Sequence, residues 1–131
     1  MDSSNVLKIF NEHFSEFLDD VQNVFPSNTD ISTAKFALLS IRKLNPSMII
    51  KIWKSYISDK YQEEIISGDI SFFIDKDYNN DFVDVDGSTS NTILQKINIL
   101  RAPIKEMGKE NQDKAMKYIQ NLTKLSNMYN K

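Results

Sequence analysis

The sequence predicts an all-α fold: a bundle of five helices plus one short helix, in an orthogonal or an up-down arrangement. Apolar residues recur at the spacing of amphipathic helices along most of the chain, and no segment alternates apolar and polar residues as a half-buried strand does. The 131 residues, 40% of them hydrophobic, suffice for one core but not for two. We therefore expect a single helical domain over residues 1–131.

The first two helices are predicted over residues 5–25 and about 31–44. Pro26 ends the first helix, and the side-chain oxygens of residues 27–30 are suited to capping the second. The apolar stripe of the first helix consists of Val6, Ile9, Phe10, Phe14, Phe17, Leu18, Val21 and Phe25. That of the second consists of Ile31, Ala34, Leu38, Ile41 and Leu44.

A third helix is predicted to start at Asn45-Pro46 and to end at Gly68. Asparagine caps well, and proline at the first helical position loses only an amide hydrogen that has no helical partner. Glycine suits the left-handed residue that follows many helices. The stripe of this helix is wide, so we expect a central element that is covered on more than one side; it includes Met48, Ile49, Ile50, Ile52, Trp53, Tyr56, Ile57, Tyr61 and Ile65.

A short helix and a long acidic loop are predicted next. Asp69 is placed to cap a single turn over residues 70–74. The apolar periodicity is then lost over residues 75–90, which hold a high proportion of aspartate. We therefore expect an irregular acidic loop over 75–90.

The last two helices are predicted over about 93–107 and about 111–129. Pro103 lies inside the first of them, where an interior proline costs roughly 3 kcal/mol. We expect a kink or a break there.

Composition excludes several classes of function. The chain has no cysteine, which rules out disulfides, thiolate nucleophiles and cysteine-based zinc sites. Its three glycines form no phosphate-binding loop. We therefore expect no cofactor and no enzymatic activity. The N-terminus lacks a secretion signal pattern and no apolar run is long enough to span a bilayer, so we expect a chain that is neither secreted nor in a membrane.

His13 is the single histidine of the chain. It lies with Glu16 and Asp20 on one face of the predicted first helix. The spacing favours a boundary histidine that contacts a neighbouring carboxylate over a metal ligand or a general base.

Charge is unevenly distributed although the net charge is only −2. Residues 1–30 hold one basic and six acidic residues, whereas residues 91–131 hold eight basic and three acidic ones. The basic residues suggest a ridge for nucleic acid, namely Lys105, Lys109, Lys114, Lys117 and Lys124. A solvated surface, or a complement to the protein's own acidic loop or first helix, is the simpler interpretation, and the near absence of arginine also argues against nucleic acid.

The acidic loop contains an incomplete calcium-binding pattern. Asp75, Asp77, Asn79 and Asp86 occupy positions 1, 3, 5 and 12 of an EF-hand loop, which supplies oxygen ligands to calcium. Position 6 is Asn80 instead of glycine, and position 12 is an aspartate instead of a glutamate. A calcium site remains an alternative, and an acidic loop without a metal is favoured.

Aromatic residues beside this loop are the candidates for contact with another protein chain. Phe72 and Phe73 are adjacent in a short element, and Tyr78 and Phe82 follow in the acidic segment. Adjacent apolar residues of a short element cannot all point inward, so we expect part of this group on the surface. The alternative is that they cover the protein's own core.

Two segments resemble a small, uncharacterised protein family of the nucleocytoplasmic large DNA viruses, the giant viruses. They are AKFALLSIRKLNPSMIIKIWKSYISDKYQEEIISGDISFFIDKDYNND and KAMKYIQNLTKLSNMY. The similarity covers most of the chain and rests on general sequence character, without a catalytic motif. It implies a virus-encoded protein that acts in the cytoplasm of the infected cell or in the virion.

We therefore predict a non-enzymatic interaction protein, most concretely a small virion component or assembly factor. Its partner is expected to be a virion protein or a second copy, because oppositely charged faces on one domain can pair.

Overall fold

The structure is a computed structural model that describes residues 3–75 and 88–129. Within these ranges the chain is helical and contains no strand, which confirms the all-α fold. The elements are α1 (Ser3–Val24), α2 (Thr29–Leu44), α3 (Met48–Trp53), the π-helix η1 (Lys54–Ser58), α4 (Gln62–Ser67), α5 (Ser71–Ile74), α6 (Ser88–Ile99), α7 (Arg101–Glu106) and α8 (Lys109–Met128).

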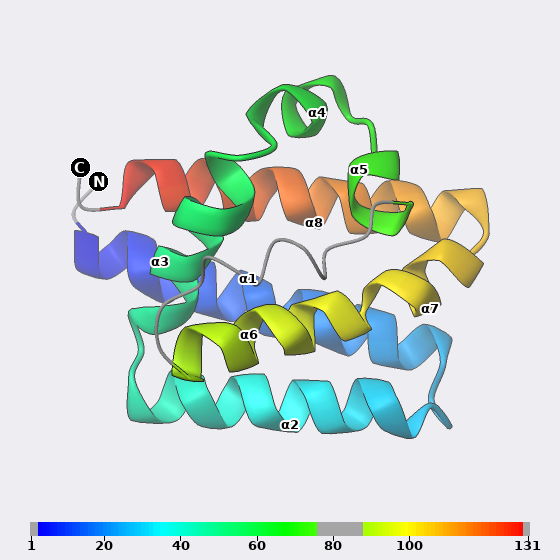
Figure 1. Ribbon diagram of the computed structural model, residues 1–131, viewed down its shortest axis with the longest axis horizontal. Coiled ribbons are helices and arrows are strands. Elements are labelled where there is room, and N and C mark those ends of the chain that lie inside the picture. The colour runs from blue at the N-terminus through cyan, green and yellow to red at the C-terminus, as the bar shows by residue number, and fades with distance from the viewer. Residues whose placement is uncertain (1–2, 76–87, 130–131) are drawn as a thin grey trace.

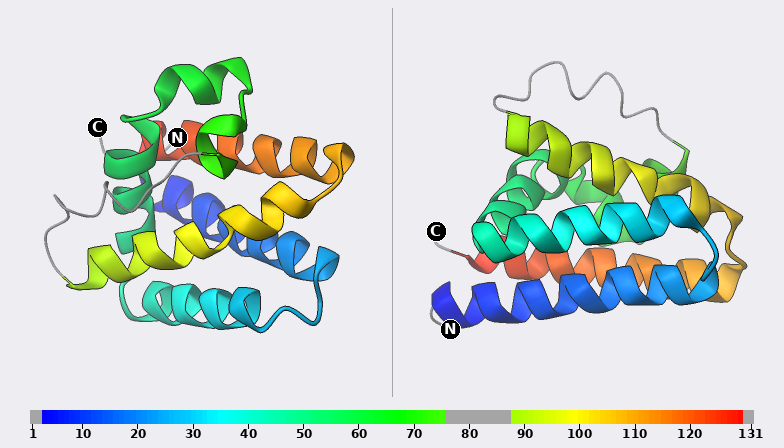
Figure 2. Two further views of the ribbon diagram at one scale, coloured as in Figure 1. Left: turned by 45° about the vertical axis from the view of Figure 1, so that its right-hand side comes forward. Right: turned by 90° about the horizontal axis from the view of Figure 1, so that it is seen from below.

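The bundle is of the up-down type and consists of α1, α2, α6 and α8, which run alongside one another in alternating directions (Figure 1). α1 packs against α8 on one side and α2 on the other, and α2 packs against α6. α3 crosses the bundle and contacts all four of these helices (Figures 1 and 2). The first turn of α1 and the last turn of α8 therefore lie at the same end of the molecule.

The core is centred on α3, as the width of its apolar stripe predicts. Trp53 is fully buried, and its ring lies edge-on to the rings of Phe10 and Phe14 of α1, at centroid distances of 6.3 and 6.2 Å. Such edge-to-face pairs are favourable because the positive ring edge meets the negative ring face. The indole N–H donates to the buried hydroxyl of Thr123 on α8 at 3.0 Å, which joins the centre of the core to the C-terminal helix.

The ends of the first helices follow the predicted punctuation. The side chain of Asn28, within the expected capping segment, accepts a hydrogen bond from the amide of Ile31 at 3.1 Å. This bond satisfies one of the amides that a helix leaves unpaired at its N-terminus. The side chain of Asp69 accepts from the amide of Ser71 at 3.0 Å, which starts the short helix α5 as predicted.

The prediction of one continuous third helix is wrong. The amide of Asp59 donates to the carbonyl of Lys54 at 3.0 Å, a five-residue step that defines the π-helix, and α4 starts only at Gln62. The extra residue of a π turn shifts the apolar stripe by only part of a turn, so the sequence periodicity does not reveal it. Gly68 ends α4 at φ +80°, in the left-handed region that was predicted for it.

The boundaries around the acidic segment also differ from the prediction. α6 starts at Ser88, so residues 88–90 belong to a helix and not to the expected loop; residues 76–87 lie outside the described ranges. The expected break near Pro103 is confirmed. It lies at Leu100, and Pro103 falls in the first turn of α7, where its missing amide hydrogen is tolerated.

Candidate binding groove between α1 and α8

Aromatic rings form part of the contact between α1 and α8. The ring of Tyr118 on α8 lies between two rings of α1, 4.7 Å from that of His13 and 5.5 Å from that of Phe17. His13 also contacts Glu16, with 3.5 Å between Nδ1 and Oε2, as its helical spacing predicts. These ring contacts set the distance between α1 and α8 at this point along the helices.

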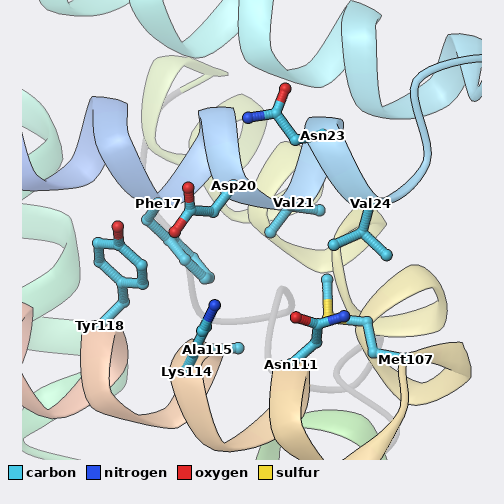
Figure 3. A pocket seen from close by; sticks show the side chains of 10 residues that line it. All are labelled: Phe17, Asp20, Val21, Asn23, Val24, Met107, Asn111, Lys114, Ala115 and Tyr118. Carbon is cyan, nitrogen blue, oxygen red and sulfur yellow. The ribbon is translucent and has the colours of Figure 1, made fainter.

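A narrow pocket of about 230 Å³ opens beside Tyr118 (Figure 3). Its floor is apolar and comes from both helices and the end of α7: Phe17, Val21, Val24, Met107 and Ala115. Its rim is polar: Asp20, Asn23, Asn111, Lys114 and Tyr118. Asp20 and Lys114, both exposed, extend into the opening from opposite walls (Figure 3).

A wider hollow of about 590 Å³ continues along the same two helices. It shares Asp20, Lys114 and Tyr118 with the narrow pocket. Its other lining residues are His13, Glu110, Asp113, Lys117 and Asn121. We call the narrow pocket and this hollow together the α1/α8 groove.

Tyr118 is the most perturbed titratable group of the groove. Burial raises its pKa to about 12, and the hydrogen bond to the Asp20 carboxylate and the nearby charges of Asp20, Glu16 and Asp19 add to the shift. The hydroxyl therefore stays protonated to higher pH than that of an ordinary tyrosine, and it donates a hydrogen bond to Asp20.

The five candidate lysines are all exposed but differ in their surroundings. Lys105 and Lys109 are each close to a carboxylate, at 3.3 Å from Asp75 and 3.4 Å from Asp113. Lys114 faces the acidic helix α1 across the groove.

The exposed lysines of α8 share their helix with acidic groups. Lys114, Lys117 and Lys124 are exposed, and the exposed carboxylates of Glu110 and Asp113 precede them in the first turns of the same helix. In part, then, these lysines complement the protein's own acidic residues.

Two of the proposed partner-binding aromatics are buried, which corrects the expectation of surface exposure. Phe72 and Phe73 are 6% and 3% exposed and belong to the hydrophobic core. Phe72 packs against the ring of Tyr61 at 5.3 Å, and Arg101 of α7 donates to the carbonyl of Phe73 at 2.6 Å. The short helix α5 thus covers the core, since α7 holds its backbone in place.

The remaining candidates of the acidic segment lie outside the described residues. These are Tyr78 and Phe82 of the partner-binding group and Asp77, Asn79 and Asp86 of the calcium pattern. The exposed carboxylate of Asp75 lies 3.3 Å from Lys105. Within residues 3–75 and 88–129, no three His, Cys, Asp or Glu side chains are grouped so that they could hold a metal ion.

The groove was not identified from the sequence. Its floor residues carry the same helical spacing as the core, so nothing in the sequence separates a residue that lines a pocket from one that is covered. The only available signal was the segregation of acidic residues in the first segment and basic residues in the last.

No protein-family model, curated protein or solved structure matches this chain. The function is therefore inferred from the groove's own residues, and the resemblance to the giant-virus family stays a prediction. None of the helices in the described ranges is long and apolar enough to cross a membrane.

Proposed function

We propose that this chain is a non-enzymatic interaction protein whose α1/α8 groove receives an apolar side chain of a partner protein. The observation that carries the proposal is the combination of an apolar floor with a rim of opposite charges in one groove. Protein interfaces place an apolar anchor in a pocket and surround it with polar groups that orient the partner.

The dimensions and the rim both favour an inserted side chain. A volume of about 230 Å³ is small for a drug-sized ligand, whose pockets typically measure about 300–1,000 Å³, but it accommodates one large side chain. The wider hollow beside it leaves room for the backbone that carries that side chain. At the mouth, the exposed side chain of Lys114 can rotate aside, whereas Tyr118 holds Asp20.

The hydrogen bond of Tyr118 supports a binding role for the rim. Its hydroxyl donates to the Asp20 carboxylate and holds that carboxylate at the mouth of the pocket. Because Asp20 is exposed, it can pair there with a basic residue of the partner.

The family resemblance gives the first partners to examine. The resemblance implies a virus-encoded protein, and we propose that it is a small virion component or an assembly factor, so virion proteins come first.

The proposal is tested by selecting ligands from a displayed peptide library. We expect the selected peptides to share one aromatic or long aliphatic residue next to a basic residue. Ala115→Leu fills the floor of the pocket, where Ala115 is 4% exposed, and should abolish their binding. Ala102→Leu makes the same change at an exposed position of α7 and should leave binding intact.

Circular dichroism and thermal unfolding establish that both variants fold. Peptides that bind the wild type and Ala115→Leu equally well would show that the pocket is not the binding site. Failure to select any peptide that distinguishes the two proteins would also count against the proposal.

A further inference from the structure

We propose that the α1/α8 groove is occupied by α2 of a second copy of this chain, with Phe36 as the inserted side chain. This inference rests on the proposed function and names its partner. It starts from the large apolar side chains that the described part of the chain leaves exposed, which are Ile9, Phe36, Leu44, Ile66 and Met128.

Phe36 is the one aromatic residue in that group. It is 75% exposed and lies in the middle of α2, far from either end of the helix. An aromatic side chain gives an interface a large contact area at a low cost in conformational entropy, which makes it the strongest anchor of the five.

The residues next to Phe36 allow another molecule to approach closely. Thr33 and Ser40 lie one turn before and one turn after it, on the same face of α2, and both are small, while the larger Leu39 is half-buried against the core. Phe36 therefore projects beyond its neighbours, and we call it the Phe36 knob. A knob of this shape can enter a narrow pocket before the two backbones collide.

The pocket offers a matching environment. Its floor, made of Phe17, Val21 and Ala115 with Met107 at one end, has no charged group. The ring of Phe36, which water surrounds in the single copy, would be transferred to an apolar site.

Charge around the knob complements the groove. Lys43 lies two turns after Phe36 on the same face of α2, about 10 Å away at 1.5 Å per residue, and it is exposed. The α1 wall of the groove carries the exposed carboxylate of Asp20, and Glu16, also exposed, lies one turn before it on α1. With Phe36 in the pocket, Lys43 of the incoming copy lies within reach of this acidic wall.

The knob and the groove are different patches, so each can be inactivated separately. Phe36→Ser removes the knob and leaves the groove intact, whereas Ala115→Leu fills the groove and leaves the knob intact. Ile66→Ser is the matched control, because Ile66 is 73% exposed but lies on α4, outside both patches.

Sedimentation velocity over a wide range of concentrations measures the association. We expect the mass of the wild type to rise with concentration, and Phe36→Ser and Ala115→Leu each to lower the association constant at least about tenfold. Ile66→Ser should associate like the wild type. Lys43→Glu should weaken association because it places a carboxylate against the acidic wall.

Mixing the two inactive variants is the decisive step. Each is expected to associate weakly alone, but together they supply one intact knob and one intact groove, so a mixed complex should form with higher affinity than either variant shows by itself. The inference is overturned if the wild type stays monomeric at every concentration, if Phe36→Ser associates as strongly as the wild type, or if the mixture associates no more strongly than the separate variants.

The two proposals fail separately. A monomeric wild type whose groove still binds selected peptides would overturn only the self-association, because the occupant would then be another protein. Selected peptides whose binding is unchanged by Ala115→Leu would overturn the proposed function itself.

Discussion

The environment of Tyr118 shows how single residues define the groove. Its ring separates the two helices by packing against His13 and Phe17, and its hydroxyl donates to Asp20 at the rim. The side chain of Tyr118 therefore sets both the spacing of the two helices and the position of a charged group at the rim of the groove. The sequence marks Tyr118 only as one aromatic residue in a basic helix, since its partners come from a helix about a hundred residues away.

The raised pKa of Tyr118 predicts a pH dependence of stability. The proton is bound more tightly in the folded chain, where the pKa is about 12, than at the ordinary value of 10. The resulting contribution to the free energy of unfolding is complete below pH 10 and is lost as the pH rises through about 12. Tyr118→Phe should remove this part of the pH dependence.

Absorbance of the tyrosinate form provides the measurement. A difference titration of the wild type against Tyr118→Phe should contain one group that titrates near pH 12. Asp20→Asn should move that group to lower pH, because the carboxylate and its hydrogen bond contribute to the shift. A difference curve centred at pH 10 would contradict the described environment.

The hydrogen bond between Trp53 and Thr123 predicts a cost for losing a buried partner. Thr123→Val conserves the shape but leaves the indole N–H without an acceptor, so the free energy of unfolding should fall by about 1–3 kcal/mol. Thr123→Ser keeps the hydroxyl and should cost less. Urea unfolding followed by the fluorescence of the single tryptophan measures both, and equal losses would show that the bond contributes little.

Helix ends decide how the elements connect. The predicted third helix is divided in the structure because the π turn moves Ser58 into the core, where it donates to Asn127 of α8 at 2.7 Å. Gly68 then reverses the chain so that α5 can return to cover the core. The left-handed glycine was predictable from its position after an apolar stripe, but the π turn was not, because it depends on a contact with α8.

The two helix-terminal glycines should respond differently to substitution. Gly68→Ala should lower the free energy of unfolding by about 1–2 kcal/mol, because φ is +80° and a side chain is strained there even though the nearest atom is 3.7 Å away. Gly108→Ser should be neutral or stabilising by at most a few tenths of a kcal/mol.

The expectation for Gly108→Ser follows from the position of Gly108 at the N-cap of α8. Gly108 has an extended backbone with φ −65°, open space around it and no side-chain capping bond. Thermal unfolding of the two variants checks the pair, and a loss at Gly108→Ser as large as that at Gly68→Ala would contradict this account.

On the scale of the whole molecule, the bundle places unlike charges side by side. The acidic helix α1 lies against the basic helix α8, so the segregation seen along the chain is largely balanced across their contact. Lys35 of α2 pairs with Asp19 at 2.5 Å and reduces the acidic charge further. The exposed surface therefore carries acidic and basic groups side by side and contains the α1/α8 groove.

This mixed surface predicts weak binding to nucleic acid. Asp20 of α1 and Glu110 and Asp113 of α8 line the same hollow as Lys114 and Lys117, so labelled DNA and RNA should show little anisotropy change even at low salt. Tight binding that falls steeply with added salt, and that Lys114→Glu and Lys117→Glu reduce, would instead establish the nucleic-acid alternative.

The helical class, most helix positions, the left-handed turn at Gly68 and the central place of the segment around Trp53 can all be predicted from the sequence. These features follow from local spacing and from single residues with strong backbone preferences. Which side chains the folded chain leaves exposed depends instead on how the helices pack. Phe72 is covered and Phe36 is not, although both are phenylalanines in helices, because exposure depends on neighbours that are distant in sequence. The groove arises in the same way, since α1 and α8 form it only when the bundle brings the two ends of the chain together.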